Sequence, residues 1–411
     1  MMARVSKRGE HQKRVIEALT RKFGPISQIG IYKLTKFRRT TISELTRQLL
    51  SEDRIVVVGR SNNPVGRKQV LLQLNERHGF VVGVEFDDEK IVAGVMDLHP
   101  TILHQVSEPT DLNHGKEGLL AQLQKCTKRV IHESGVSPNA VIGIGIADPG
   151  LVDSRRGVTV LSSTIDFWHD VELKQIFEQE FDIQTVVESK TRAKTLAEQM
   201  LGADKPLENL IYLDYGAGIG AGIVVDGKLL YGHSCGVGEI GHTRINDDGP
   251  ACKCGSIGCL EAIAGTAAVE RKVRKALAEG AISQVTALSE NSTNVTTQMV
   301  LQSASNGDKL CGNILSELAR DLGVALANTV NLFNPSDIVL DRSLKSGGKL
   351  LIDQISHVIR GHALSSFTDS MVLRFSELDE MSGILGLGLV VLEKHFEIQA
   401  AHRISPEIES A

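Results

Sequence analysis

A histidine and three cysteines lie close together in the second half of the chain. His242 precedes Cys252, and Cys254 and Cys259 follow within the run CKCGSIGC. Imidazole nitrogen and thiolate sulfur are ligands that suit tetrahedral Zn2+, and three sulfurs with one nitrogen complete its coordination. The two glycines of the run allow the tight turns that bring the cysteines to one ion. The pattern predicts one structural zinc ion per chain that does no chemistry. Buried or disulfide-linked cysteines are the alternative, although a Cys-x-Cys pair is poorly placed for a disulfide with itself.

Composition and charge narrow the class of protein. The chain has 411 residues, enough for two or three domains. Residues 1–78 carry 17 Lys and Arg against 6 Asp and Glu, a net charge of +11, whereas the remainder carries 28 against 44. The N-terminus lacks the apolar stretch of a signal peptide, and no apolar run approaches membrane-spanning length. Because the six cysteines do not form a secreted disulfide framework, we expect a cytoplasmic protein.

Helical spacing of apolar residues predicts three short helices at the basic N-terminal end. The first ends at a Gly-Pro dipeptide, and the second opens at Ile26 and Ser27. The third lies in RRTTISELTRQLLSED, where Thr41 and Glu44 have capping-box spacing. Two strands follow, RIVVVGR and GRKQVLLQL, joined by a turn-rich segment. This order predicts a winged helix-turn-helix.

Double-stranded DNA is the partner that we predict for residues 1–78. In this motif the second helix enters the major groove, where Arg and Thr contact base edges and Lys and Arg contact phosphate. The residues that we expect to contact DNA are Arg38, Arg39, Thr40, Thr41, Ser43 and Arg47 on the helix and Arg60, Arg67 and Lys68 on the ribbon. A helical-pair interaction domain is the alternative, which the net positive charge disfavours.

Strands and helices alternate through the rest of the chain. VVGVEFDDEKIVAGVMDL predicts a hairpin of buried strands, and VVESKTRAKTLAEQM passes from strand to helix. LIYLDYGAGIGAGIVVDGKLLYG predicts a strand, a glycine-rich turn and a second strand. The pattern predicts an α/β fold with two lobes around a cleft. We expect a smaller lobe over 79–195 together with a C-terminal helix at about 381–398, and a larger zinc-containing lobe over 196–380 that is involved in oligomerisation.

The order of these motifs resembles one family, ROK, which comprises repressors, open reading frames and sugar kinases. GEIGH followed by CKCGSIGCLE matches the family's zinc signature, and the winged helix with its GRK ribbon turn matches the repressor branch. The resemblance covers nearly the whole chain. It implies a two-lobed, actin-like (ribonuclease H-like) sugar-kinase fold, a dimer or higher oligomer, and control of genes for xylose, glucose or N-acetylglucosamine use.

The chain departs from the family's kinases at three elements. Their D-x-G-G-T phosphate loop is replaced by residues 85–89, EFDDE, whose carboxylates would repel a polyphosphate. The proton-accepting Asp of their E-N-D-A-N run is Lys190 here, and a lysine that is protonated at neutral pH cannot accept a proton. The glycines of their nucleotide segment are replaced by Asp341, Arg342 and Ser343. We therefore predict a body without catalytic activity.

The resemblance also implies a sugar site, of which this chain keeps only part. Glu239 and Glu261 match positions that accept hydrogen bonds from sugar hydroxyls, and the zinc loop would set the distance between them. The residues that we assign to an effector site are Glu239, Glu261, Thr164, Ser189 and Lys190. Lys190 and Arg192 would suit an anionic effector such as a sugar phosphate. Alternatively, both pair with Glu188 or with the acidic loop at 85–89.

These observations predict a DNA-binding transcriptional repressor of carbohydrate genes. We expect a homodimer or homotetramer in which the body is the effector-binding and dimerisation module. Two alternatives stay open. One is a sugar kinase that carries a DNA-binding extension, and the other is a regulator controlled by a partner protein that docks near the zinc loop.

Overall fold

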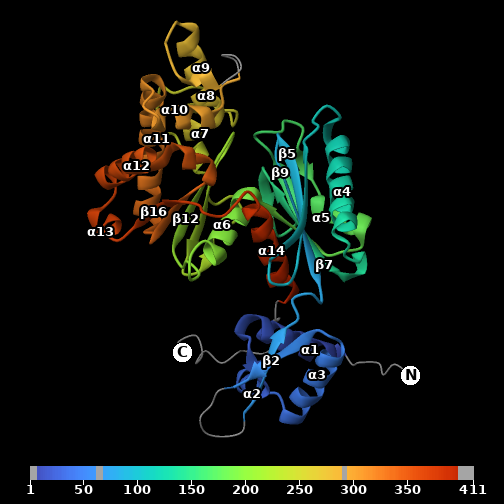
Figure 1. The fold of residues 1–411 in the computed structure, drawn as a ribbon. Coiled ribbons are helices and arrows are strands. Elements are labelled where there is room, and N and C mark those ends of the chain that lie inside the picture. Colours follow the sequence, from blue (N-terminus) through green and yellow to red (C-terminus); the bar gives the residue numbers. More distant parts are fainter. Residues whose placement is uncertain (1–6, 62–67, 289–293, 397–411) are drawn as a thin grey trace.

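The computed structural model describes residues 7–61, 68–288 and 294–396. Figure 1 shows a small N-terminal unit, here called the head, beneath a body of two lobes. Within the described residues, no helix is long and apolar enough to span a membrane.

The head contains the predicted order of a winged helix-turn-helix. Its helices are α1 (Lys7–Phe23), α2 (Gln28–Thr35) and α3 (Arg39–Ser51), and its strands are β1 (Ile26–Ser27), β2 (Ile55–Arg60) and β3 (Val70–Leu74). The strands form an antiparallel sheet of order β1-β3-β2. Apolar residues at helical spacing build the core, among them Ile16, Ile42 and Leu49. The pattern of apolar residues thus placed all three helices and the ribbon.

Two details of the head were predicted wrongly. Ile26 and Ser27 form a short strand that pairs with β3, and the Ser27 side chain caps α2 by accepting a hydrogen bond from the Gly30 N–H at 3.1 Å. The capping box was also wrong, because α3 begins at Arg39 and Thr41 lies inside it. Arg38 is the residue at the cap and makes no side-chain capping bond.

The first lobe is built on a five-stranded sheet of order β11-β7-β4-β5-β6. Its strands are β4 (Phe80–Phe86), β5 (Lys90–Met96), β6 (Ile102–Pro109), β7 (Val141–Asp148) and β11 (Thr185–Ser189). Helices α4 (Gly115–Ser134) and α5 (Leu173–Phe181) cover one face, and β8 (Leu151–Asp153), β9 (Val158–Leu161) and β10 (His169–Val171) form a small second sheet. Strand β4 is buried along nearly its whole length, as its continuous apolar sequence predicts.

The second lobe repeats this topology. Its sheet has the order β14-β13-β12-β15-β16, and each of the two sheets has two antiparallel pairings on one side of its first strand and two parallel pairings on the other. The strands are β12 (Leu210–Tyr215), β13 (Ile219–Val225), β14 (Lys228–Leu229), β15 (Asp337–Leu340) and β16 (Val372–Phe375). The helices are α7 (Leu260–Ala264), α8 (Thr266–Ala278), α9 (Val285–Leu288), α10 (Thr297–Ser305), α11 (Lys309–Phe333), α12 (Gly348–His362) and α13 (Ser365–Thr368).

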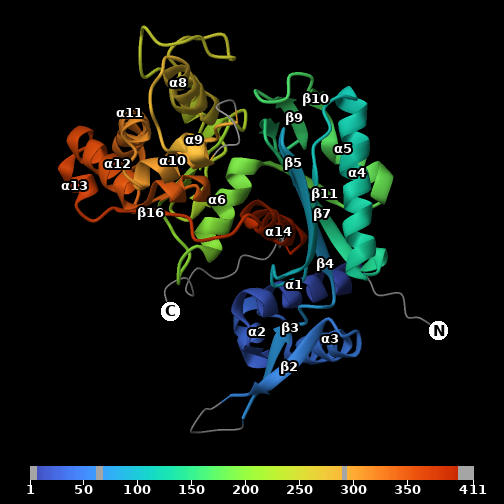
Figure 2. The ribbon, with the colours of Figure 1, turned by 45° about the horizontal axis from the view of Figure 1, so that its top comes forward.

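Two helices, α6 (Lys190–Leu201) and α14 (Ser382–His395), lie between the lobes in both views (Figures 1 and 2). They pack so closely that a Cβ atom at Gly386 would lie 1.7 Å from the carbonyl oxygen of Ala193. The far end of α14 reaches the head, where the Arg21 guanidinium lies 5.6 Å from the centre of the Phe396 ring. The C-terminal helix therefore touches the first lobe and α6, and the residue that follows it touches the head.

Candidate DNA-binding and effector sites

The exposed face of α3 carries the polar side chains predicted to contact DNA. Four residues of α3 face the core of the head: Ile42, Leu45, Thr46 and Leu49. Because an α-helix repeats every 3.6 residues, Thr40 and Arg47 lie on the opposite face, and both are exposed. Arg38 and Arg39 are exposed at the start of the helix, and Thr41 and Ser43 are half-buried on its flanks. We call the surface formed by Arg38, Arg39, Thr40 and Arg47 the reading face.

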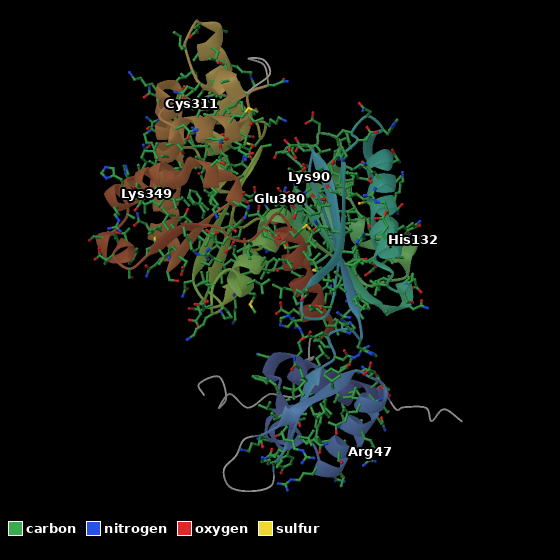
Figure 3. All side chains as sticks on the ribbon, in the orientation of Figure 1. Arg47, Lys90, His132, Cys311, Lys349 and Glu380 are labelled. Atoms are coloured by element: carbon green, nitrogen blue, oxygen red, sulfur yellow. The ribbon has the colours of Figure 1, made fainter. Side chains whose placement is uncertain are left out.

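The reading face points away from the body. Figure 3 shows Arg47 on the side of the head that is remote from both lobes, so DNA can approach it without meeting the body. On the ribbon, Arg60 ends β2 and Lys68 precedes β3, and both are exposed. Arg67, also predicted to contact DNA, lies outside the described residues.

Cations on the reading face lack acidic partners, whereas two others in the head have them. Lys13 on α1 is buried and bonds to Glu52, and Arg54 pairs with Glu17 at 2.6 Å. Neither Arg39 nor Arg47 forms an ion pair with any described residue. The first two cations are neutralised within the fold, and the arginines of the reading face are free for phosphate or base edges.

Helix α2 holds the start of α3 in place. The Arg39 guanidinium lies 4.9 Å from the centre of the Tyr32 ring, which is a cation–π distance. The Gln28 side-chain amide donates to the Thr46 hydroxyl at 2.7 Å and links the two helices. These contacts fix the angle between α2 and α3, as a helix that enters a groove requires.

His242, Cys252, Cys254 and Cys259 converge in the second lobe, with their ligand atoms all within 4.8 Å of one another. The Cys254 and Cys259 sulfurs are 3.7 Å apart, and the Cys252 sulfur lies 3.7 Å from His242 Nδ1. The distance between sulfurs is too long for a disulfide, whose S–S bond is about 2.0 Å. It matches the edge of about 3.8 Å in a tetrahedron with bonds of about 2.3 Å to a central ion. The four residues therefore form a cluster that could hold a metal ion.

Two glycines shape the loop of this cluster. Gly255 and Gly258 have positive φ angles of 90° and 68°. A Cβ atom at Gly258 would lie 1.6 Å from the carbonyl oxygen of Asn246. The tight turns expected of these glycines are therefore present and bring the cysteines together.

A cavity of about 680 Å3 lies between the lobes, and all five residues assigned to an effector line it. Glu239 and Glu261 flank the His/Cys cluster: Glu239 precedes His242, and Glu261 follows Cys259 on α7. Burial raises the pKa of Glu239, an effect that His242 and Arg192 oppose. Glu261 accepts a hydrogen bond from the Ile219 N–H at 3.3 Å. The loop with the His/Cys cluster thus places both carboxylates at the cavity.

Thr164 reaches the cavity on a loop that a buried carboxylate anchors. Asp148 Oδ2 accepts hydrogen bonds from the Trp168 ring N–H at 2.7 Å and from the Thr159 hydroxyl at 2.6 Å. The Lys253 ammonium, between two cysteines of the cluster, donates to the Ser163 carbonyl at 3.3 Å. The cluster loop therefore contacts the loop of the first lobe that carries Thr164.

Lys190, which stands where the kinases have their proton acceptor, is paired with carboxylates. Its ammonium donates to Asp87 Oδ2 at 2.6 Å and lies 3.4 Å from Glu85. Burial acts to lower the pKa of Lys190, but Glu85 and Asp87 more than offset this and raise it. A lysine with a raised pKa stays protonated and cannot act as a base at neutral pH.

Arg192 also lines the cavity, but its guanidinium is bound to groups of the protein itself. It is 3% exposed, pairs with Glu188, and donates to the carbonyl oxygens of Cys235 and Val152. The sequence left two interpretations of Lys190 and Arg192, an anionic effector or ion pairs within the protein. The structure favours ion pairs, of Arg192 with Glu188 and of Lys190 with the acidic loop at 85–89.

A third paired cation at the cavity, the half-buried Lys194, was missed by the sequence analysis. Its ammonium donates to Asp214 at 2.8 Å and to Asp341 at 2.9 Å, and Asp341 also accepts from the Tyr212 hydroxyl at 2.6 Å. Burial acts to lower the pKa of Lys194, but the two carboxylates raise it well above its usual value. The network ties α6 to the ends of β12 and β15. Asp341 is the first of the three residues that replace the glycines of the nucleotide segment.

A basic head with a reading helix, joined to a two-lobed body with a cleft and a His/Cys cluster, defines a regulator built on a sugar-kinase fold. The model of the ROK family matches residues 81–394. The chain therefore belongs to the ROK family.

Named relatives span both head and body. The xylose repressor of Caldicellulosiruptor bescii is 29% identical over 367 residues, 89% of this chain and 92% of that protein. The DNA-binding transcriptional dual regulator NagC of Escherichia coli is 30% identical over 376 residues, 90% of this chain and 89% of that protein. These relatives support a DNA-binding repressor of sugar metabolism.

Solved structures confirm the actin-like sugar-kinase fold. A ROK family transcriptional regulator, described as a homolog of the E. coli MLC protein, has a TM-score of 0.80 and 25% identity, and the match covers 94% of this chain and 97% of that one. A ROK family glucokinase from Streptomyces griseus, in complex with glucose and AMPPNP, has a TM-score of 0.67 and 28% identity, with 76% and 99% covered. The regulator thus matches more of this chain than the kinase does.

Proposed function

We propose that the chain is a DNA-binding repressor of genes for carbohydrate use, in which the body senses an effector and holds two heads at a fixed separation. The observation that carries this proposal is the reading face, whose arginines form no ion pair with a described residue and on which Arg47 lies remote from the body. Such a surface can neutralise DNA phosphates and contact the edges of bases. A regulator that binds DNA shares a compartment with it, so we place the protein in the cytoplasm.

Two copies of the chain would place one α3 in each half of an operator. A dimer with two-fold symmetry binds half-sites about one helical turn, or a multiple of it, apart, so the operator is expected to be close to palindromic. We propose a head over residues 1–78, a smaller lobe over 79–195 with the helix at about 381–398, and a larger lobe over 196–380 that pairs with its copy. A homotetramer would present two such pairs.

Arg47→Ala and Arg39→Ala test the reading face. Each change removes a cation that forms no ion pair with a described residue, so we expect operator affinity to fall about 10-fold or more while the fold is kept. The measurement is a titration of fluorescent operator DNA at several salt concentrations, where loss of a phosphate contact also flattens the salt dependence. Arg320→Ala, an exposed arginine of the second lobe, is the matched control and should bind like the unchanged protein. Equal affinity in all variants would refute this face as the DNA site.

The His/Cys cluster is proposed to hold one structural Zn2+. Three thiolates and one imidazole suit this ion, and the 3.7 Å separations fit a tetrahedral centre. Such a site has no open position, so the ion would supply rigidity to the loop and no bond-making chemistry. Its effect would be to fix the distance between Glu239 and Glu261.

We propose that the body does not catalyse phosphoryl transfer. Protonated Lys190 stands in place of the proton acceptor. Asp341, which accepts a hydrogen bond from Lys194, stands in the segment that carries nucleotide-binding glycines in the kinases. The carboxylates of the loop at 85–89 would also oppose a polyphosphate. The runner-up function, a sugar kinase with a DNA-binding extension, predicts ATP consumption with a monosaccharide in a coupled assay.

The effector that the cavity favours is a neutral, polyhydroxylated molecule. Glu239 and Glu261 accept hydrogen bonds, whereas Lys190, Arg192 and Lys194 are already paired with carboxylates. Arg342, which also lines the cavity, is the cation there that forms no ion pair with a described residue. A sugar would bind by its hydroxyl groups, with Thr164 and Ser189 as further polar contacts. Binding would change the angle between the lobes and so the separation of the heads.

Calorimetry with matched neutral and phosphorylated monosaccharides tests this assignment. We expect heat from a neutral sugar and none from its phosphate ester. Glu239→Gln should weaken binding about 10- to 100-fold, because a hydrogen bond to a charged group is lost. Glu279→Gln, at an exposed position in the second lobe, is the control. Heat from the phosphate ester alone would contradict the assignment.

The other alternative is control by a partner protein that docks near the cluster loop. It predicts that no sugar binds, and that a protein captured from a cell lysate releases the chain from its DNA.

A further inference from the structure

Glu44 is an acidic residue in the middle of a reading helix that is otherwise neutral or basic. It is the single carboxylate of α3, and its side chain is exposed. At 100° per residue it lies one turn after Thr40 and one turn before Arg47, on the surface opposite the buried residues. Glu44 makes no hydrogen bond or ion pair with any described residue, including Arg47 one turn away.

A role in stabilising the helix does not account for this position. A carboxylate supports a helix in its first turn or in a capping box, but α3 begins at Arg39 and Glu44 lies in its second turn. The residue is also too exposed to contribute to the core. Its position instead places a carboxylate on the surface that α3 would present to a groove of DNA.

A carboxylate facing DNA needs a donor, because phosphate oxygens repel it. An ionised carboxylate only accepts hydrogen bonds. In the major groove, the N–H donors are the exocyclic amino groups of cytosine and adenine. Asn and Gln suit adenine, which offers a donor beside an acceptor, whereas a carboxylate suits the lone amino group of cytosine. The cations Arg39 and Arg47, which precede and follow Glu44 along the helix, would hold the phosphates and keep Glu44 over the groove.

We propose that Glu44 determines base specificity by accepting a hydrogen bond from the N4 amino group of a cytosine in each half-site. The inference rests on the proposed function, because it requires that α3 reads DNA. Arg39 and Arg47 supply most of the affinity, and Glu44 supplies discrimination at one base pair.

Selection from random duplexes by the full-length protein tests the proposal. We compare the unchanged chain with Glu44→Gln and Glu44→Ala and then measure the affinity of each for the selected duplex and for the three duplexes that differ from it at one base pair. The expected result is that both changes abolish the preference for one C·G pair per half-site, a preference of roughly 5- to 150-fold. Binding to unrelated DNA should rise slightly, because a negative charge is removed.

Asp53→Asn is the matched control. It removes the same charge from an exposed position just after α3, where Asn tolerates the positive φ of 56°. This variant should select the same sequence as the unchanged chain. An identical selected sequence for Glu44→Ala, with affinity raised equally for all DNA, would overturn the role of Glu44 while leaving the proposed function intact. Loss of preference at an A·T pair would overturn the assignment to cytosine. An unchanged protein that selects no sequence would overturn the proposed function itself.

Discussion

Cys254→Ala is expected to lose its metal ion and to bind operator DNA more weakly, although the change lies far from the head. Removing one of four ligands opens the proposed site, and we expect metal affinity to fall more than about 100-fold. The loop then no longer fixes Glu239, Glu261 and the Lys253 contact with the first lobe at 3.3 Å. The measurements are zinc per chain after dialysis against a chelator, and operator affinity at one salt concentration.

Cys126→Ala is the control for this prediction, because it removes a buried thiol of α4 in the first lobe and no ligand. It should keep its metal and its DNA affinity. If the metal-free Cys254→Ala protein binds the operator as tightly as the unchanged chain, the loop has no influence on the heads.

Lys194→Met is expected to destabilise the body strongly. The change leaves the buried carboxylate of Asp341 and the half-buried one of Asp214 without their cation, and breaking a buried ion pair from one side costs up to about 3–5 kcal/mol. For a lobe of this size, that corresponds to a fall of roughly 10 °C in melting temperature. Scanning calorimetry of the full chain measures this fall in melting temperature. The melting temperature of the head should not change.

Two further variants make this prediction specific. Lys349→Ala breaks an exposed pair with Asp353 within α12 and should cost only about 0.3–0.5 kcal/mol. Lys194→Met combined with Asp214→Asn and Asp341→Asn removes all three charges and should recover part of the loss. A melting temperature of Lys194→Met that equals that of Lys349→Ala would show that the network contributes nothing.

Sequence alone located what is local in the chain. The His/Cys cluster is compact, because three of its ligands lie within one loop, and Glu239 and Glu261 adjoin those ligands in sequence. Apolar periodicity placed α1 and α3 because their buried side chains recur at helical spacing. The strands of the body were recognisable by another local signal, because β4 and β7 are almost continuously apolar.

Long-range pairing was not visible in the sequence. Lys194 and Asp341 are 147 residues apart and meet only because α6 crosses the end of β15. The partner of Lys190 was left open between two sets of carboxylates, and only the fold brings it to Asp87, 103 residues away. The capping box failed for a local reason: buried Phe37 anchors the chain just before α3, so the helix starts at Arg39, ahead of the Thr-x-x-Glu pattern.

Lys194 also bears on how this body behaves in a cell. Asp214 and Asp341 carry their counterion on the same polypeptide, so the bond between α6 and the second sheet needs no dissolved magnesium to form. In the proposed function, the body would therefore keep its resting shape when the supply of divalent ions or nucleotide changes with growth. The angle between the two lobes would then depend on the occupant of the cavity and not on the energy state of the cell.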